Sequence, residues 1–476
     1  MSLNFHKNTY AGPIRVLPTL LIFWLLLPAF HLLAPAVSGA ACTGSSPVWG
    51  STVDYASVNN CVGNATPGDT ILVSAGTATW NSTLGVTKGI SLIGAGSDAA
   101  GSVIINGGGA ARTLISYNAD TSADDPFRVS GFRFIMGGGG SVFELDCRRE
   151  SGSVDQTKIR IDHNYAENNR LFGDNGGFFG TSDCFGVVDN NELVDIRSPF
   201  RFWGDDSGNE TSWDREPAGK TQGGSKYLYV EDNMISGIDN TYMVLDADEN
   251  GSWAIRYNTI SFAGADQANY FDMHPTCMSL ESYGNRLNAT IDNNLISWRG
   301  GKALSFYNNI VGSTWDNYAY NNDGSYPKSN MGHNNGYLFG SRINTDGNLV
   351  GFVEGPDDVN TITENVTYWL DNTTETGSIQ TYGVRCGIDR TVVTTCTEGV
   401  AFWETFQSCT DLTGLTGDIN TYPNRSVITG TLYKCGASSN WLAYFTPYTY
   451  PHPLRAEPIA KRPLPPTNLS GNLQEN

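Results

Sequence analysis

The sequence predicts an all-β protein that coils as a parallel β-helix with capped ends. A hydrophobic run ending at an asparagine recurs along the middle of the chain at intervals of 24 to 27 residues, with one interval of 42. Apolar and polar residues alternate before each asparagine, and helical periodicity is nowhere sustained. A period of this length indicates one structural unit per repeat, stacked on the next. The copies end at Asn164, Asn191, Asn233, Asn258, Asn285, Asn309 and Asn335.

Each repeat has the length of one turn of a parallel β-helix. Three short strands at about 3.3 Å per residue, with their bends, need roughly 22 to 28 residues. The long interval then holds an insertion of about 16 residues, in the polar, glycine-rich stretch near 204–224, and such loops usually lie on a functional face. We expect each repeat asparagine to enter the left-handed backbone region at a bend and to hydrogen-bond to the asparagine of the next turn.

Residues 1–40 have the composition of a cleaved export signal. Lys7 and Arg15 precede an apolar run at 16–30, and small residues at 38–40 suit a signal peptidase. No later segment is apolar enough to span a membrane. The sequence therefore predicts a secreted or cell-surface protein without a stable transmembrane anchor. Because Cys42 follows the cleavage site, a lipid anchor on its sulfur is an alternative.

Nine cysteines in an exported chain predict disulfides, since none of them has zinc-binding spacing. Proximity along the chain suggests three pairs, Cys42 with Cys61, Cys386 with Cys396, and Cys409 with Cys435, although spacing alone does not fix connectivity. An odd number leaves one thiol free, lipidated or paired with another chain.

The formal net charge of −19 excludes nucleic acid as a partner, because a polyanion is repelled at long range. An acidic ligand such as a polyuronate would therefore need a local basic patch or divalent cations held between carboxylates.

The remaining elements follow in chain order. Residues 41–66 form an N-terminal cap with a short amphipathic helix around 53–61, since a solenoid must cover its open end. The β-helix itself occupies 67–375. A cysteine- and aromatic-rich C-terminal cap follows at 376–455, and the proline-rich end, 456–476, is predicted to be a disordered tail.

The first turns resemble those of a known superfamily. Gly68-Asp69-Thr70 followed by hydrophobic residues, and Leu92-Ile93-Gly94-Ala95-Gly96, are similar to the opening of bacterial right-handed parallel β-helix proteins of the pectate-lyase-like superfamily. The resemblance covers residues 50–350 and implies a right-handed, single-stranded β-helix that handles polysaccharides.

Three shorter stretches resemble motifs of that superfamily. Ile161-Asp162-His163 is similar to the Ile-Asp-His of pectate lyases, with Arg160 where they have Trp. Arg197-Ser-Pro-Phe-Arg201 is similar to their Arg-x-Pro-x-x-Arg element, whose first arginine is the base, with the second arginine one residue early. This implies that Arg197 and Arg201 contact an acidic substrate. Tyr270-Phe-Asp272-Met-His274 resembles the Asp-Pro-His-Asp of alginate C5-epimerases, with Pro275 at the last position.

Residues at equal offsets from successive repeat asparagines should form columns along one face. Offsets of 12 to 17 after four consecutive copies give carboxylates, cations and aromatic rings, a set that predicts a saccharide groove. The alternative without a function is that a chain rich in Asp and Asn places such residues on solvated turns by chance. The column residues are Asp205, Asp206, Asp246, Asp248, Asp272, His274, Arg299, Lys302, Trp203, Tyr270 and Trp298, and the insertion adds Trp213.

Two reactions fit these residues. In β-elimination, Ca²⁺ held by Asp246, Asp248 and Asp272, with Asp205 and Asp206 as further metal ligands, neutralises a uronate while Arg299, Lys302 or His274 removes the C5 proton. In glycoside hydrolysis, Asp246 and Asp272 on adjacent turns, about 5 Å apart, flank the scissile bond. The sequence thus predicts a lyase for an extracellular acidic polysaccharide. A glycoside hydrolase, a uronate C5-epimerase, and a non-catalytic carbohydrate-binding, adhesive or fibre-forming protein are the alternatives.

Overall fold

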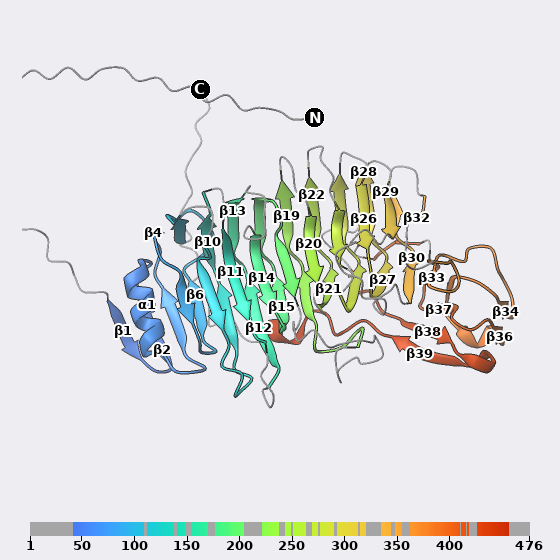
Figure 1. The fold of residues 1–476 in the computed structure, drawn as a ribbon, viewed down its shortest axis with the longest axis horizontal. Helices are drawn as coiled ribbons and strands as arrows, with labels where there is room; N and C mark the ends of the chain where they lie inside the picture. Colours follow the sequence, from blue (N-terminus) through green and yellow to red (C-terminus); the bar gives the residue numbers. More distant parts are fainter. Residues whose placement is uncertain are drawn as a thin grey trace, which may run out of the picture. The chain divides into compact units, whose positions relative to one another are not determined.

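Three long sheets contain most of the regular structure in this computed structural model (Figure 1). The structure describes residues 41–108, 112–137, 140–148, 154–169, 177–203, 221–237, 243–248, 251–262, 269–274, 277–289, 293–312, 315–319, 335–343, 348–354, 362–409, 411–415, 417 and 426–456. The predicted signal at 1–40, the tail from 457 and residues 204–220 of the insertion lie outside them. All described residues belong to one compact unit, Ala40–Asn476.

The chain visits the three sheets in turn, so that from β3 to β33 each sheet receives every third strand and pairs it in parallel. We call the sheets A, B and C. Sheet A contains β1 (Cys42–Ser45), β2 (Val48–Ser51), β3 (Thr70–Val73), β6 (Ser91–Gly94), β9 (Phe127–Ser130), β12 (Gln156–Asp162), β15 (Cys184–Asp189), β18 (Leu228–Glu231), β21 (Ser252–Arg256), β24 (Ser279–Tyr283), β27 (Lys302–Phe306), β30 (Gly336–Phe339) and β33 (Tyr368–Trp369).

Sheets B and C each contain ten strands of the described chain. Sheet B contains β4 (Gly76–Trp80), β7 (Ser102–Asn106), β10 (Phe132–Ile135), β13 (Tyr165–Asn169), β16 (Glu192–Ile196), β19 (Met234–Gly237), β22 (Thr259–Phe262), β25 (Arg286–Ala289), β28 (Asn309–Gly312) and β31 (Arg342–Ile343). Sheet C contains β5 (Leu84–Val86), β8 (Ile115–Asn118), β11 (Ser141–Asp146), β14 (Gly177–Ser182), β17 (Phe200–Trp203), β20 (Met243–Asp248), β23 (Asn269–Met273), β26 (Asn293–Trp298), β29 (Trp315–Ala319) and β32 (Gly351–Glu354).

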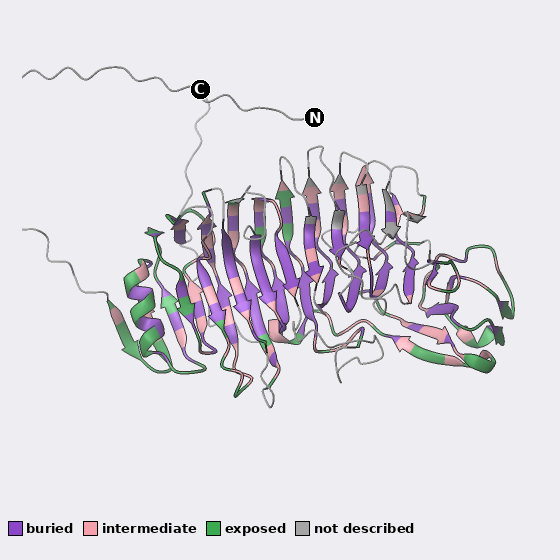
Figure 2. Ribbon diagram, viewed as in Figure 1, coloured by how far each residue is buried: buried purple, intermediate pink, exposed green. Residues whose placement is uncertain are grey.

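This arrangement confirms the predicted all-β class with long parallel sheets and is compatible with a β-helix. Inward-facing residues of successive strands stack into apolar columns, as Ile161, Val188, Val230 and Ile255 do in sheet A, each fully buried. Alternation along each strand sends the next side chains outward. Figure 2 shows the strands of the middle turns as largely buried. The core therefore runs along the stack between the three sheets.

The asparagine ladder exists, with a corrected register. The side-chain amide of each member donates to the side-chain oxygen of the next, at 2.9 to 3.1 Å, from Asn164 through Asn285. The ladder then continues through Asn308 and Ser341, not through the predicted Asn309 and Asn335.

The left-handed backbone conformation, predicted for the ladder asparagines themselves, occurs one residue earlier. It belongs to the residue before each ladder member, for example His163 (φ 53°), Asp232 (φ 60°) and Tyr257 (φ 62°). The ladder residue can then turn its amide inward, between sheets A and B.

A hairpin and a helix occupy the N-terminal end. Strands β1 and β2 pair antiparallel, and α1 (Tyr55–Asn64) begins after Asp54, whose carboxylate accepts from the backbone N–H of Ser57. This is the capping interaction that Asp favours at a helix start. The predicted Cys42–Cys61 disulfide is present, so the Cys42 sulfur is not available for a lipid. No helix in the described ranges is long and apolar enough to cross a membrane.

The C-terminal region corrects the other two disulfides. The bonds are Cys386–Cys409 and Cys396–Cys435, because strand packing, not chain proximity, brings these pairs together. Cys147–Cys184 is a fourth bond and Cys277 is a buried free thiol. The elements here are β34 (Ile379–Gln380), β35 (Val384–Gly387), η1 (Arg390–Val392), β36 (Thr395–Cys396), β37 (Ala401–Glu404), β38 (Thr431–Cys435), η2 (Ala437–Ser439), β39 (Trp441–Phe445) and η3 (Pro453–Ala456).

After β39 the chain runs back along the outer face of sheet A (Figure 1). We call residues 446–456 the C-terminal strap. Arg256 donates to the carbonyls of Tyr448 and Thr449, at 2.7 and 3.0 Å, and Arg160 donates to that of Leu454. The ring of Tyr448 stacks on Tyr229 with centroids 5.0 Å apart. The end of the predicted cap thus lies against the middle of sheet A.

The strap covers a row of ion pairs, which we call the sheet A ion column. Arg256 contacts Glu231 at 2.7 Å and Arg160 contacts Asp189 at 3.1 Å, while Arg455 of the strap reaches both carboxylates. Asp162, from the Ile-Asp-His stretch, belongs to this column and pairs with Arg128. That stretch is therefore part of the scaffold of sheet A.

Candidate functional site

The outer face of sheet C carries a second group of charged side chains. Parallel register places Arg201, Asp246 and Asp272 on neighbouring strands, and sets Trp203 beside Asp248 in the same way. The residues between them, such as Ala247 and Met273, point into the core, so alternation sends the charged ones outward. We call this group, whose side chains are 5 to 25% exposed, the sheet C cluster: Arg201, Asp246, Asp248, Asp272, His274 and Arg299.

His274 lies at the centre of the sheet C cluster. It follows β23 directly, and its Nε2 lies 3.0 Å from Oδ1 of Asp246 and 3.8 Å from Oδ2 of Asp272. Its Nδ1 lies 3.7 Å from Oδ2 of Asp248. The imidazole thus contacts three carboxylates supplied by two adjacent strands.

The two arginines flank this arrangement. Arg299 donates from Nε to Oδ1 of Asp272 at 3.0 Å and from Nη2 to Oδ2, a two-point contact that fixes the carboxylate plane. Arg201 lies 3.7 Å from Asp246, and its guanidinium carbon lies 4.5 Å from the ring centroid of Trp203. Positive charge therefore stands on both sides of the central imidazole.

The pKa values of the two central carboxyls move in opposite directions. Burial raises the pKa of Asp246, but contact with His274 and the charges of Arg201 and Arg299 outweigh it, so the pKa is lowered. Burial dominates at Asp272 and raises its pKa despite Arg299. Burial lowers the pKa of His274, but Asp246 and Asp272 outweigh it and raise the pKa above 6.5. Two carboxyl groups whose pKa values are shifted in opposite directions are suited to act as the acid and the base of a proton transfer.

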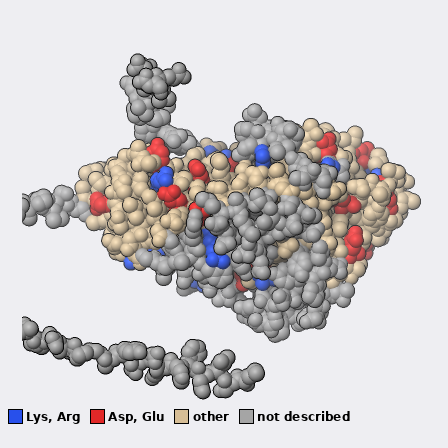
Figure 3. Space-filling view, turned by 90° about the horizontal axis from the view of Figure 1, so that it is seen from above, with Lys and Arg blue, Asp and Glu red and all other residues tan. Residues whose placement is uncertain are grey.

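The sequence correctly predicted that several residues of the sheet C cluster lie on one surface. Asp246, Asp248, Asp272, His274 and Arg299 share one surface, as their common offsets predict, and Asp246 and Asp272 are direct register partners. Arg201 and Trp203 lie on the adjacent strand β17. On the face shown in Figure 3, described acidic and basic side chains lie intermixed.

Other predicted residues lie elsewhere. Trp298 is 1% exposed and its indole N–H donates to Gly301, so the ring belongs to the core instead of a sugar-binding surface. Lys302 is the first residue of β27 in sheet A. The pKa of Lys434 is lowered by the burial of Lys434 itself and, to a smaller extent, by the positive charge of Lys302. The causes differ, because the Trp298 side chain points into the core, whereas Lys302 is partly exposed but already belongs to the next sheet. Arg197 lies in the turn between β16 and β17.

Four predicted residues are not tested by the structure. Asp205, Asp206 and Trp213 lie outside the described residues. The backbone of Tyr270 belongs to β23, but its side chain is outside the description.

Glu144 is a neighbouring carboxylate that the sequence search missed. It pairs in register with Gly180, which pairs with Arg201. A Cβ at Gly180 would lie 2.6 Å from Oε2 of Glu144, so the absent side chain makes room for this carboxylate over the next strand. Burial raises the pKa of Glu144. The search missed it because β11 precedes the first repeat asparagine, although the alternation in Phe143-Glu144-Leu145 marks it as outward-facing.

The cluster does not fit the predicted Ca²⁺ site. Asp246, Asp272 and His274 offer ligand atoms within 4.8 Å of one another, but one of them is a nitrogen. Calcium prefers an all-oxygen shell, whereas imidazole suits transition metals. Arg299 also contacts both oxygens of Asp272. Of the predicted calcium ligands the structure describes Asp246, Asp248 and Asp272, and each of them contacts His274.

Comparisons of the chain with protein-family models, with curated proteins and with solved structures give no match.

Proposed function

We propose that this protein is an exported right-handed parallel β-helix that cleaves an acidic polysaccharide by β-elimination at the sheet C cluster. The three-sheet strand order supports the β-helix, and crossovers between parallel strands are right-handed in nearly all proteins. Four disulfides support folding in an oxidising compartment outside the cytosol.

The observation that carries the proposal is the position of His274. Its imidazole contacts Asp246, Asp248 and Asp272, and two arginines stand on the flanking strands. A histidine held by carboxylates has a fixed ring orientation, which a general base requires. Arg201 and Arg299 are the cations of the cluster that can contact a uronate carboxylate, on a protein of net charge −19.

In this reaction neutral His274 removes the C5 proton of a uronate residue. The C5–H electron pair forms the C4=C5 double bond as the C4–O4 bond breaks, and the leaving oxygen takes a proton. Arg201 and Arg299 stabilise the negative charge that builds on the uronate carboxylate when C5 is deprotonated. We assign the transfer of this proton to Asp272, and the effect of burial, which raises its pKa, supports that role.

A glycoside hydrolase is the second candidate, favoured by one observation. Asp246 and Asp272 are register partners with oppositely shifted pKa values. The ligand oxygens of this pair lie within 4.8 Å of each other, close to the spacing of about 5 to 5.5 Å between the carboxyls of retaining enzymes. In this case Asp246 is the nucleophile, Asp272 is the acid, and His274 only orients Asp246.

The test compares wild type with His274→Asn on a panel of polyuronates, with and without added Ca²⁺. We expect the ultraviolet absorbance of the conjugated C4=C5 product to appear with wild type. The variant should lose roughly 10²- to 10⁴-fold in kcat/KM, the usual contribution of a general base. Because the base must be neutral, activity should rise as pH increases through the raised pKa of His274.

A matched control is His163→Asn, which removes another partly exposed histidine that contacts an aspartate, Asp162. Its activity should equal that of wild type. New reducing ends without the ultraviolet product would select the hydrolase instead. If no polymer gave either the ultraviolet product or new reducing ends, the lyase and the hydrolase would both be rejected. The protein would then be a binding or structural surface protein.

A further inference from the structure

A buried carboxyl group holds the end of the insertion against sheet A. Glu281 of β24 is 0% exposed, and its Oε1 accepts a hydrogen bond from the backbone N–H of Gly223 at 2.5 Å. The hydroxyl of Tyr229, on β18, donates to the carbonyl of Gly224 at 2.7 Å. Residues 221–224 are therefore attached to two strands of sheet A.

The strap covers these residues from the other side. Gly223 has a φ of 75°, and a Cβ there would overlap the carbonyl oxygen of Thr446, the first residue of the strap, and lie 3.4 Å from the ring of Phe445. Glycine fits because it adopts a positive φ without strain and has no side chain. Residues 221–224 thus lie between sheet A and the strap, and Glu281 is enclosed where the three segments meet.

Few charged groups face Glu281. No ion pair within the described ranges involves it, because Arg256 of β21 directs its guanidinium to the sheet A ion column and to the strap carbonyls. Its other titratable neighbours are the hydroxyls of Tyr229 and Tyr283, whose own pKa values are raised by burial. Residues 221–224 and the start of the strap carry no charged side chain. An ionised Glu281 would therefore be poorly compensated in this position.

The closed arrangement favours the protonated form of Glu281. Burial raises its pKa to about 7, while the N–H of Gly223 and the charge of Arg256 lower it by less. If residues 221–224 detach, water reaches the carboxyl and its pKa returns toward the ordinary 4.5. The closed form then holds the proton more tightly than the open form. Its stabilisation is complete below about pH 4.5 and is lost as the pH rises to about 7.

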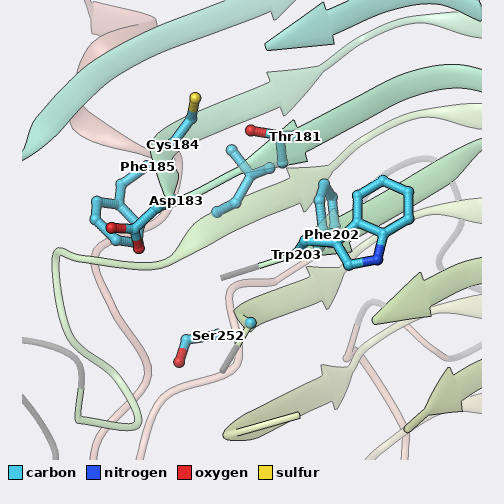
Figure 4. A pocket seen from close by; sticks show the side chains of 9 residues that line it. Thr181, Asp183, Cys184, Phe185, Phe202, Trp203 and Ser252 are labelled. Carbon is cyan, nitrogen blue, oxygen red and sulfur yellow. The ribbon is translucent and has the colours of Figure 1, made fainter. Parts of the chain in front are cut away.

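We propose that Glu281 is a pH-sensitive latch, which holds residues 221–224 between sheet A and the strap while its carboxyl is protonated and loosens them once it ionises. These residues end the insertion, whose other end follows Trp203 in the wall of a small pocket beside the sheet C cluster (Figure 4). The latch thus connects pH with the segment that joins the candidate site to sheet A. It does not rest on the proposed reaction.

The test measures hydrogen exchange of the full chain between pH 5 and 8, by mass spectrometry of the peptide that contains residues 221–224. After correction for the intrinsic exchange rate, opening of this segment in wild type should increase about tenfold per pH unit up to pH 7 and then level off. Glu281→Gln keeps the shape of the protonated carboxyl and an oxygen that accepts from Gly223. In this variant the opening should be independent of pH.

Asp371→Asn is the matched control. Burial also raises the pKa of Asp371 to about 7, and its carboxyl accepts from the backbone N–H of Gly340 in another part of the chain. This variant should leave the pH dependence at residues 221–224 unchanged. The same pH dependence in Glu281→Gln as in wild type, or its loss in Asp371→Asn, would overturn the latch.

A second variant tests the contact with the strap without changing the carboxyl. In Gly223→Ala the added Cβ crowds Thr446, so opening of residues 221–224 should increase at every pH while its slope against pH stays that of wild type. Opening equal to that of wild type would show that the strap does not hold this segment, and would overturn the latch even if Glu281→Gln failed to fold.

Discussion

The outer faces of sheet A and sheet C both carry rows of acidic and basic side chains. They differ in whether another part of the chain covers those side chains. In the sheet A ion column, Arg256 and Glu231 are both 0% exposed, and the C-terminal strap donates and accepts further hydrogen bonds there. In the sheet C cluster, Asp246, Asp248 and His274 retain 18 to 25% exposure. Charges whose partners all come from the chain itself stabilise the fold, whereas partly exposed charges remain available to a ligand.

The histidines show the same difference. His452 of the strap is 4% exposed, its ring contacts both Tyr229 and Tyr448, and burial lowers its pKa to about 4. Carboxylates raise the pKa of His274 above its usual 6.5. At neutral pH the imidazole of His452 is therefore uncharged, whereas the carboxylates around His274 favour its protonated form.

The largest expected effect is the loss of Arg256. Arg256→Met leaves Glu231 buried beside fewer cations and removes two donors to the strap. Breaking such a buried pair should lower the free energy of unfolding by about 3–5 kcal/mol. Urea denaturation measures it, and a loss below about 1 kcal/mol would show that the column is not needed for stability.

A smaller effect concerns pH and the strap. Because the folded pKa of His452 lies below that of the unfolded chain, the unfolded state binds more protons between pH 6.5 and about 4. Stability should therefore fall on acidification, by about 3 kcal/mol once pH is below 4. In His452→Asn, whose amide oxygen can still accept from Leu454, this part of the pH dependence should disappear. An unchanged profile would assign the acid sensitivity to other groups.

The smallest effect on stability is expected in the sheet C cluster. Arg299→Met removes the two-point contact to Asp272 at a site where the arginine is 10% exposed. The free energy of unfolding should drop by about 1–3 kcal/mol, less than for Arg256→Met, while activity is strongly reduced. If instead Arg299→Met destabilised more than Arg256→Met, the division into a structural face and a functional face would fail.

Sequence reasoning predicted the architecture because the same side-chain requirement recurs in every turn. The ladder amides, the strand alternation and the equal offsets of Asp246 and Asp272 are local signals that repeat. The register slip at Asn308 arose because two asparagines stand side by side there, and only the backbone decides which one turns inward.

Contacts distant in the chain could not be predicted in this way. Nothing periodic links Arg160 with Leu454, or Cys396 with Cys435. Pairing by proximity failed in the C-terminal region because its sheet combines one parallel strand pair with two antiparallel pairs. Trp298 shows a further limit, since an aromatic at a column offset can face the core as readily as the surface.

The strap also sets an order in which the molecule can be completed during synthesis. Arg160 donates to the carbonyl of Leu454, which is synthesised 294 residues later. Glu231 accepts from the backbone N–H of His452, 221 residues later. Turns made early can stack as they emerge, since each contacts mainly its neighbours. Their charged outer face, however, reaches its final set of partners only after residues 446–456 have left the ribosome. A chain that lacks residues 446–456 would keep the Arg160–Asp189 and Arg256–Glu231 pairs, but would lose the contacts of Arg455 and the strap backbone that complete and cover them.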